Sequence, residues 1–291
     1  MGRLHALTIE PVPEWVDVAR LVGVVEALHE EPLGAGLRRV RVQVPRDVAA
    51  DVQARLRGLG LDGEALQVRV EPALTRSVVR AARTVDARRR RAGTVGFRDG
   101  RVQVDGEGRM SLTPEALALA MARSTRGQRV LDACCGVGGN AIAFARSGAQ
   151  VTALESDQGR LALARHNARL YGVVDRMRFV FGDARVLVPQ STADLLFVDP
   201  PWGAEYSRLR VGLEDLPLLR DLLPVARRFG QVWLKVPPSF DCRQLPWATP
   251  TAVFGEAAGD FHRIKFLWLR FQGVDLPADW GDSTPEDTTP R

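Results

Sequence analysis

A glycine-rich turn between a buried strand and a helix is the feature that most constrains the fold of this chain. Residues 129–145 read RVLDACCGVGGNAIAFA. The apolar residues Val130, Leu131 and Ala133 are typical of a parallel strand that is covered on both faces. Gly136 and Gly138 allow a sharp turn and a close approach to a ligand, because they carry no Cβ atom. Asn140 begins the next helix, whose first N–H groups would face anything that rests on the turn. The stretch therefore predicts a strand, turn and helix with a ligand site at the turn.

The residues around the turn discriminate between two common ligands. A dinucleotide site has the pattern G-x-G-x-x-G, which residues 136–141, GVGGNA, meet only through the final alanine. Asp132, just before the glycines, would repel a pyrophosphate but can accept hydrogen bonds from an amine. S-adenosylmethionine carries an amino group and a sulfonium and no phosphate. The charge pattern thus favours S-adenosylmethionine and leaves a nicotinamide dehydrogenase as an alternative.

Strand-like segments recur after the turn, and most are separated by helix-length spacers. The last two lie about ten residues apart, which leaves no room for a helix, so they are predicted to form an antiparallel hairpin. Together with the first strand, the series predicts an α/β fold: a doubly wound, seven-stranded, mostly parallel sheet with helices on both faces. The segments are 151–154, 179–181, 195–198, 231–235, 251–254 and 264–271.

Each of the first four predicted strands ends in an acidic residue. In open α/β sheets, ligands bind beyond the carboxyl ends of the strands, so these acids should gather around one ligand. Glu155 offers two acceptors to the two ribose hydroxyls of an adenosine, and Asp183 is placed to accept from an adenine amino group. Either acid could instead cap the helix that follows it. The four acids are Asp132, Glu155, Asp183 and Asp199.

The fourth strand is followed by the tetrad Asp199-Pro200-Pro201-Trp202. The prolines fix the backbone so that carbonyl oxygens and the Asp199 carboxylate converge, and the indole of Trp202 offers a flat face for a base. This arrangement suits an exocyclic amine whose lone pair faces a sulfonium methyl. Such a transfer needs positioning and electrostatics, so no metal is expected. The alternative is a rigid loop with a core tryptophan.

Residues 1–92 are predicted to form a smaller α/β region, ahead of a main domain at 93–272. Within the main domain, residues 93–109 are expected to form a short hairpin, in which residues 97–104 turn at Asp99-Gly100. Thr113 and Pro114 are expected to begin a helix as N-cap and first helical residue. In the N-terminal region, strands are expected at 4–10, 38–44 and 66–70, and helices at 15–29 and 47–59.

Arginine dominates the positive charge of the chain, which is +5 overall with a pI near 9.7. Residues 75–91 are predicted to be a helix on which Arg76, Arg80 and Arg83 share one face. Guanidinium groups favour phosphate contacts, so this helix and the N-terminal region are candidates for RNA binding. The alternative is a solvated basic helix that joins two domains.

Composition and chain ends give further expectations. No apolar run reaches the ~20 residues of a membrane-spanning helix, and no signal peptide is recognisable, so a cytoplasmic location without membrane association is expected. Residues 273–291, rich in Asp, Thr and Pro, are expected to be a disordered tail. Cys134, Cys135 and Cys242 lack metal-ligand spacing and are interpreted as reduced and structural.

Five motifs resemble the methyltransferase core of the trimethylguanosine synthases, which methylate N2 of the 7-methylguanosine cap on small RNAs. These motifs are VLDACCGVGGNAIAFA, VTALESD, ALARHNARLYGV, FVFGDA and DLLFVDPPWGAEY, and the resemblance covers about residues 100–206. It implies a Rossmann-like class I methyltransferase fold, S-adenosylmethionine as cofactor and RNA as partner. Thr113 and Pro114 would close over the cofactor and Trp202 would stack on the guanine, with Tyr206 as a further RNA contact. By position, the residues surrounding the cofactor would be Asp132, Gly136, Gly138, Asn140, Glu155 and Asp183.

The chain departs from the family at the tetrad, where the family has serine in place of Asp199. Aspartate there is typical of amino-methyltransferases that act on unmodified adenine or guanine. We therefore predict an S-adenosylmethionine-dependent RNA methyltransferase that acts on an exocyclic base amine, with guanine N2 favoured. The sequence leaves open adenine-N6 methylation of RNA or DNA, N-methylation of a protein or small molecule, and a non-catalytic RNA-binding scaffold. It does not specify the oligomeric state.

Overall fold

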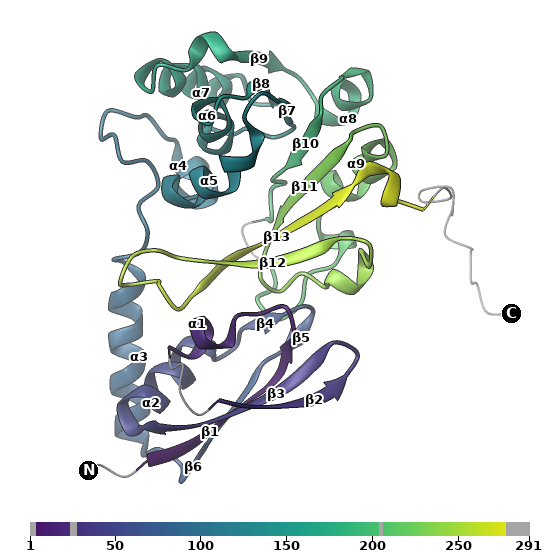
Figure 1. The fold of residues 1–291 in the computed structure, drawn as a ribbon. Coiled ribbons are helices and arrows are strands. Elements are labelled where there is room, and N and C mark those ends of the chain that lie inside the picture. Colours follow the sequence, from purple (N-terminus) through teal and green to yellow (C-terminus); the bar gives the residue numbers. More distant parts are fainter. Residues whose placement is uncertain (1–3, 24–27, 204–205, 278–291) are drawn as a thin grey trace, which may run out of the picture.

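The computed structural model describes residues 4–23, 28–203 and 206–277, and its largest sheet has seven strands (Figure 1). Their order is β12-β13-β11-β10-β7-β8-β9. Neighbouring strands are parallel except at β13, which runs antiparallel to both β11 and β12. The predicted α/β sheet and its terminal hairpin are confirmed. The strands are β7 (Arg129–Asp132), β8 (Gln150–Glu155), β9 (Met177–Phe181), β10 (Leu195–Val198), β11 (Gln231–Val236), β12 (Thr249–Phe254) and β13 (Ile264–Gln272).

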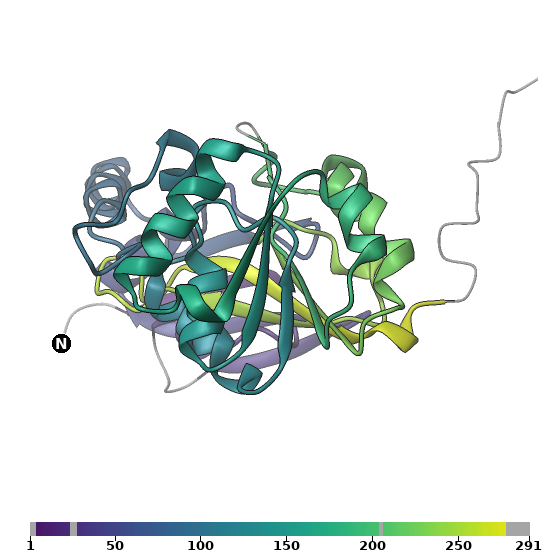
Figure 2. The same cartoon turned by 90° about the horizontal axis from the view of Figure 1, so that it is seen from above.

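Helices lie on both sides of this sheet, as the view from above shows (Figure 2). Successive residues of β7 point to opposite faces. Val130 packs in one hydrophobic cluster with Phe144, and Leu131 packs in the other with Leu223. Because both faces are buried, the neighbouring residues Val130 and Leu131 are both apolar, where a half-exposed strand would alternate. The helices are α5 (Glu115–Ala122), α6 (Gly139–Arg146), α7 (Gln158–Leu170), α8 (Ala184–Leu187) and α9 (Pro217–Ala226).

The N-terminal residues form a separate four-stranded sheet in the order β2-β3-β1-β6. Its strands pair antiparallel, and helices α2 and α3 pack against one another beside it (Figure 1). A short hairpin, β4–β5, projects between α2 and β6 in the chain. The elements are β1 (Leu4–Pro13), α1 (Val18–Val22), β2 (His29–Gly34), β3 (Leu37–Pro45), α2 (Arg46–Leu56), β4 (Gly60–Leu61), β5 (Glu64–Ala65), β6 (Gln67–Glu71) and α3 (Arg76–Arg90).

The helix predicted over residues 15–29 is wrong over most of its length. Helix α1 ends at Gly23, whose left-handed φ of 85° stops the helix. His29 instead begins β2, an edge strand that pairs with β3. Residues 24–27 lie outside the described residues. The sequence of β2, HEEPLG, is largely exposed and lacks the apolar alternation that would have predicted a strand.

The hairpin predicted within residues 93–109 is also wrong. In its place are irregular backbone and a short helix, α4 (Gly106–Ser111), which is capped by Asp105. The backbone of the irregular part bonds to side chains of neighbouring helices. Glu115 accepts from the N–H of Arg98 at 2.7 Å, and Asn167 both accepts from and donates to the backbone of residue 103 at 2.9 Å. These side chains satisfy backbone groups that a hairpin would have paired with each other.

Two expected chain features differ in detail. Thr113 does not act as N-cap, because Pro114 occupies that position and the Thr113 hydroxyl has no hydrogen-bond partner. At the other end, residues 273–275 form a 3-10 helix and Leu276 is buried. Residues 278–291 of the expected tail lie outside the described residues. Among the described residues, no helix is long and apolar enough to cross a membrane.

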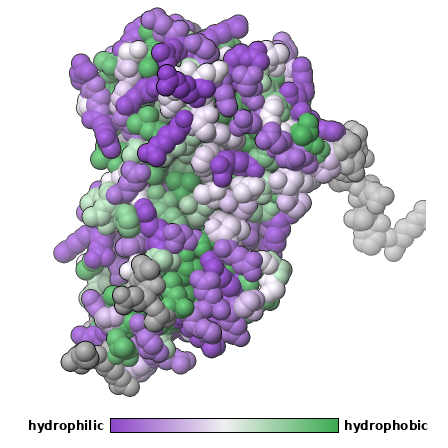
Figure 3. All heavy atoms as spheres, in the orientation of Figure 1, coloured by the Kyte–Doolittle hydropathy of each residue, from purple (hydrophilic) through white to green (hydrophobic). Residues whose placement is uncertain are grey.

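The N-terminal sheet packs against the β12–β13 side of the large sheet, and residues of both contribute to one hydrophobic cluster. Figure 3 shows apolar residues gathered at mid-height, where the two sheets meet, on a face that is otherwise largely hydrophilic. The β4–β5 hairpin reaches loops beyond β10 and β11. The N–H of Gly60 donates to the carbonyl of Arg208 at 2.6 Å, and Asp62 accepts from the N–H of Cys242 at 2.8 Å. The N-terminal region therefore touches the loop that follows the tetrad.

Candidate active site

The glycine turn has the predicted strand, turn and helix form. Gly136 and Gly138 have φ values of 55° and 95°, which residues with a Cβ atom rarely adopt. A Cβ atom added at Gly136 would meet nothing within 4 Å, so the outer side of the turn is open. Gly138 is the N-cap of α6, and Asn140 lies in its first turn. The turn is therefore open at a helix N-terminus.

Glu155 points at the glycine turn from the end of β8. Its Oε2 accepts from the N–H of Gly136 at 2.9 Å, its Oε1 accepts from the N–H of Asp157 at 2.9 Å, and the residue is buried. Oε1 also accepts from the Ser156 hydroxyl at 3.4 Å, and because a carboxylate has about four acceptor positions, Oε2 retains acceptor capacity for a ligand. Glu155 is therefore fixed in orientation and still able to accept.

Asp132 is fully buried at the end of β7. Its Oδ1 accepts weakly from the N–H of Cys134 at 3.4 Å, and its Oδ2 has no partner. Burial, followed by the negative charge of Asp199, raises the pKa of Asp132 well above its usual value. A cation placed beside this carboxyl would stabilise its charged form.

Asp199 forms an ion pair with the buried Lys235 that the sequence analysis missed. Its Oδ2 accepts from Nζ of Lys235 at 2.7 Å and from Nδ2 of Asn140 at 3.1 Å. Burial raises the pKa of Asp199, while the ammonium of Lys235 acts in the opposite direction. Lys235 also donates to the carbonyl of Ser111 at 3.2 Å. A signal was present in the sequence, because Lys235 is one of only two lysines and interrupts the apolar strand VWLKV.

Trp202 is half-buried beside this ion pair. Its ring centroid lies 5.5 Å from that of Tyr206, edge to face, and 5.3 Å from Nζ of Lys235. Its Nε1 is buried without a hydrogen-bond partner. Of the two prolines in the tetrad, Pro200 is buried and Pro201 is exposed. The tetrad thus joins the sheet core at Pro200 and reaches the surface at Pro201.

Helix α4 and the residues after it lie over the glycine turn. A Cβ atom at Gly139 would come within 2.4 Å of Leu112 and 3.8 Å of the Thr113 carbonyl oxygen. Arg160 of α7 holds α4 in place, because it pairs with Asp105 at 3.1 Å and Glu107 at 2.5 Å. Thr113 and Pro114, both buried, therefore adjoin the turn, and their closure over the cofactor stays a prediction.

The other predicted residues lie outside this cluster. Asp183 is half-exposed and accepts from the N–H of Arg185 at 2.8 Å, so in this structure it caps α8. Arg76, Arg80 and Arg83 are exposed on α3 in the N-terminal region. Their roles toward adenine and RNA remain predictions.

Cys134 and Cys135 lie close to the site and Cys242 lies beside Asp62, and none of the three is a reactive group. Burial, followed mainly by the charge of Asp132, raises the pKa of both Cys134 and Cys135 well above the usual value. Burial does the same for Cys242. Within the described residues, no group of three or more His, Cys, Asp or Glu side chains could hold a metal ion. The thiols therefore stay protonated at neutral pH.

The chemistry of the cluster fits a cationic ligand. The buried carboxylates of Asp132 and Glu155 and the partly buried carboxylate of Asp199 lie near one buried ammonium, that of Lys235. Buried polar atoms without a partner also lie here, and such atoms are costly unless a ligand or water satisfies them. The excess of negative charge matches the amino and sulfonium groups of S-adenosylmethionine. The unpartnered atoms are Thr113 Oγ1, Asp132 Oδ2, Asn140 Oδ1 and Trp202 Nε1.

Comparison with known proteins connects this site to RNA methyltransferases. The family described as RNA cap guanine-N2 methyltransferase matches residues 127–215, which include the turn and the tetrad. The trimethylguanosine synthase of Schizosaccharomyces pombe is 36% identical over 126 residues, covering 39% of this chain and 52% of the relative. That of Saccharomyces cerevisiae is 29% identical over 190 residues, 59% of each chain. The ribosomal RNA small subunit methyltransferase J of Rhodopseudomonas palustris is 32% identical over 157 residues, 50% of this chain and 76% of the relative. The chain thus spans little more than half the length of the yeast relatives.

Proposed function

Because the chain belongs to the trimethylguanosine synthase-like family of S-adenosylmethionine-dependent methyltransferases, we propose that it methylates an exocyclic amine of an RNA base, guanine N2. One observation carries the proposal. Asn140, at the start of the helix that follows the glycine turn, donates to Asp199 of the tetrad at 3.1 Å. The cofactor side and the acceptor side are thereby joined by a single hydrogen bond. The proposal retains the cytoplasmic location expected from the sequence.

On the cofactor side, Asp132 and Glu155 would hold S-adenosylmethionine together with the open turn at Gly136. When bound, the cofactor supplies an electrophilic methyl group. Asp132 Oδ2 is a free acceptor for an ammonium, and Glu155 has acceptor capacity for a ribose diol. Asp183 is proposed as the adenine contact, which would require it to release its cap on α8.

On the acceptor side, Asp199 and Trp202 would hold the base. Among the described residues, the Asp199 hydrogen bonds from Lys235 and Asn140 both go to Oδ2, so Oδ1 is the atom available to an amine N–H. The Lys235 ammonium favours the charged form of Asp199, which accepts more strongly than the protonated form. The indole of Trp202 would support the ring of the base. Asp199 Oδ1 is also where the proton released by the amine can be placed.

Adenine N6 is the second candidate, because the carboxylate of Asp199 suits it as well as guanine N2. A carboxylate accepts from any exocyclic amine, and nothing in the tetrad contacts a feature unique to guanine. A nucleoside analysis separates the two candidates.

The test is methyl transfer to total cellular RNA by the purified protein, followed by mass spectrometry of the nucleosides. We expect N2-methylguanosine to appear with the wild type and to be lost in Asp199→Asn, which keeps the size of the side chain but weakens the acceptor. Calorimetric binding of S-adenosylhomocysteine should persist in that variant and shows that it is folded. Formation of N6-methyladenosine alone would select adenine. A protein that binds S-adenosylhomocysteine but modifies neither base would contradict the proposal.

A further inference from the structure

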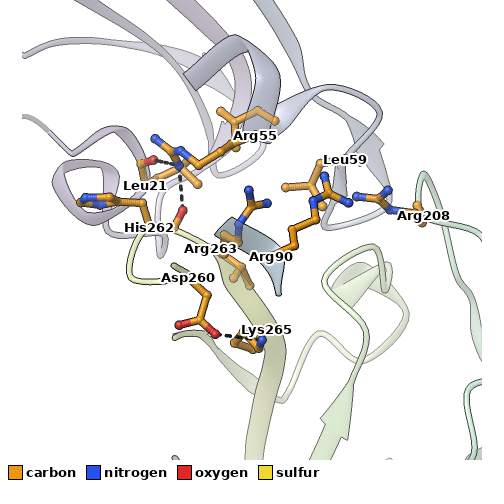
Figure 4. A pocket seen from close by; sticks show the side chains of 11 residues that line it. Leu21, Arg55, Leu59, Arg90, Arg208, Asp260, His262, Arg263 and Lys265 are labelled. Atoms are coloured by element: carbon orange, nitrogen blue, oxygen red, sulfur yellow. Dashed lines mark hydrogen bonds and ion pairs between the residues drawn. The ribbon is translucent and has the colours of Figure 1, made fainter. Parts of the chain in front are cut away.

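A cavity of about 270 Å³ lies between the N-terminal region and the segment leading into β13 (Figure 4). Its N-terminal wall includes Arg55, Leu59 and Arg90, from α2, the residues after it and the end of α3. Its other wall includes Arg208, from the loop after the tetrad, Asp260 and residues 262–265. The cavity exists only because the two parts of the chain are packed together.

Positive charge exceeds negative charge around this cavity. Lys265 pairs with Asp260 at 3.0 Å, and Arg55 pairs with Asp51 at 2.7 Å. Arg90 and Arg263 share one carboxylate, that of Asp86. The cavity lining and its ion-pair partners contain three carboxylates, those of Asp51, Asp86 and Asp260. Against these stand six basic side chains, counting Arg89, which pairs with Asp51 from outside the lining. The other five are Arg55, Arg90, Arg208, Arg263 and Lys265.

Two of these arginines have unused binding capacity. Arg208 is exposed, and its guanidinium makes no hydrogen bond or ion pair within the described part of the chain. Arg263 is largely buried, and its Nε has no partner. Burial, followed by the charge of Arg55, lowers the pKa of Arg263. Figure 4 shows the guanidinium groups of Arg90, Arg208 and Arg263 directed into the same space beside Leu59.

Hydrogen bonds that involve main-chain groups hold part of this cationic lining in position. Nη1 of Arg55 donates to the carbonyls of Leu21 and His262, both at 2.8 Å, so it ties α1 to the segment before β13. The N–H of Gly60 holds the carbonyl of Arg208 at 2.6 Å. The Arg55 side chain and the main chain of Arg208 are therefore held before any ligand arrives, which lowers the cost of binding one.

One residue of the cavity lining, Arg208, is close in sequence to the proposed acceptor site. Arg208 follows Trp202 by six residues. Six extended residues span at most about 21 Å, so the two side chains are anchored within that distance of each other. A strand that places a base on Trp202 can therefore place one of its phosphates near Arg208.

We propose that this cavity binds a backbone phosphate of the RNA whose base is methylated at the tetrad. Guanidinium groups bind phosphate oxygens in a bidentate manner, and the surplus of charge calls for an anion. The inference rests on the proposed function for the identity of the anion. It assigns a role to the N-terminal region, which supplies one wall of a substrate site.

The test measures binding of a fluorescein-labelled single-stranded RNA of about 20 nucleotides by anisotropy, at a series of salt concentrations from about 50 to 200 mM. We expect Arg208→Gln to weaken binding and to reduce the slope of log K against log salt by about 0.7, the value for one lost phosphate contact. Arg208→Lys should retain the slope, because it keeps the charge. Arg90→Gln should act in the same direction as Arg208→Gln.

Arg178→Gln is the matched control. Arg178 is an exposed arginine in β9 that lines a cavity of similar volume, about 290 Å³, at the amino ends of β7 and β8. This variant should bind RNA as the wild type does. An unchanged slope in Arg208→Gln, or an equal loss in Arg178→Gln, would overturn the proposal. Tighter binding of duplex DNA of the same length, with the same dependence on Arg208, would overturn the assignment to RNA.

The binding assay needs no turnover, so its outcome is separate from that of the proposed function. A changed slope in a protein that methylates no base would support the phosphate site and contradict the methyl transfer. Methylation with no change in slope would do the reverse. Thermal unfolding of each variant verifies that the protein remains folded.

Discussion

At the scale of single residues, the pair formed by Lys235 and Asp199 has the largest energetic consequence. Removing one partner of a buried ion pair costs about 3–5 kcal/mol, whereas replacing both costs little. We expect Lys235→Met to lower the free energy of unfolding by about that amount, and Asp199→Ser combined with Lys235→Met to recover most of it. Urea denaturation of the two single variants and the double variant measures the coupling. Strictly additive effects would show that the pair is not coupled.

Asp132 predicts how cofactor affinity depends on pH. Burial, and then the charge of Asp199, raise its pKa in the folded protein, so its contribution to stability falls as pH rises from about 4 toward that pKa. A bound cation favours the carboxylate and lowers the pKa. The affinity for S-adenosylmethionine should therefore increase with pH over the same range, and Asp132→Asn should be weaker and much less pH-dependent.

Calorimetry from about pH 5 to pH 8 tests this expectation. Asp175→Asn is the control. Asp175 is exposed in the segment between α7 and β9, so this variant should behave as the wild type. Glu155, Asp199 and Lys235 face the same site, so some pH dependence can survive in Asp132→Asn. A variant whose dependence equals that of the wild type would contradict the assignment to Asp132.

The sequence predicted the acidic residues at the strand ends but not the partner of Asp199. Asp132 and Glu155 could be placed because each closes a strand with a clear apolar pattern. Lys235 could not, since its pairing depends on register. Val198 of β10 lies opposite Leu234 of β11, which places the following residues, Asp199 and Lys235, side by side. A single sequence contains no measure of that alignment.

At the scale of elements, α4 covers the glycine turn, and Arg160 holds α4 in place. The two ion pairs of Arg160 are partly exposed, so their loss should cost less than about 1 kcal/mol of stability each. We expect Arg160→Ala to leave the protein folded, to increase amide exchange in residues 106–111 and to weaken binding of S-adenosylhomocysteine. Hydrogen exchange and calorimetry measure these effects. Arg169→Ala, on the exposed side of the same helix, is the control.

Protection of residues 106–111 that is the same in Arg160→Ala and the wild type would show that other contacts hold α4. The contact between Leu112 and Gly139 is the main candidate.

The segment that leads into α4 was also where prediction from sequence failed. A turn at Asp99-Gly100 suggested a hairpin, but the backbone there bonds to Glu115 and Asn167. Such bonds are made across the tertiary structure and leave no local pattern.

At the scale of the whole molecule, the β4–β5 hairpin joins the N-terminal region to the loop that bears Arg208. A Cβ atom at Gly60 would lie 1.8 Å from the carbonyl oxygen of Leu209, so the contact tolerates no side chain. We expect Gly60→Ala to lower stability by more than about 1 kcal/mol and to weaken RNA binding, while affinity for S-adenosylhomocysteine is kept. Thermal unfolding and the two binding assays measure this.

Gly100→Ala is the matched control, because a Cβ atom there would meet nothing within 4 Å. Equal loss of cofactor and RNA affinity in Gly60→Ala would contradict a role for the hairpin in RNA binding alone. The seven strands of the large sheet and its terminal hairpin were predicted from the repeating pattern, but their order and register were not. The packing of the N-terminal region was not, since it depends on single contacts such as that between Asp62 and the N–H of Cys242.

The protonated state of the three thiols has a practical consequence for labelling this protein. Cys134, Cys135 and Cys242 should react slowly with maleimides, because the thiolate is the reactive form and burial disfavours it. A cysteine introduced on the surface, as in Arg178→Cys, would then take up a dye selectively without removal of the native ones. The natural chain is in this respect already a clean background for single-site fluorescence.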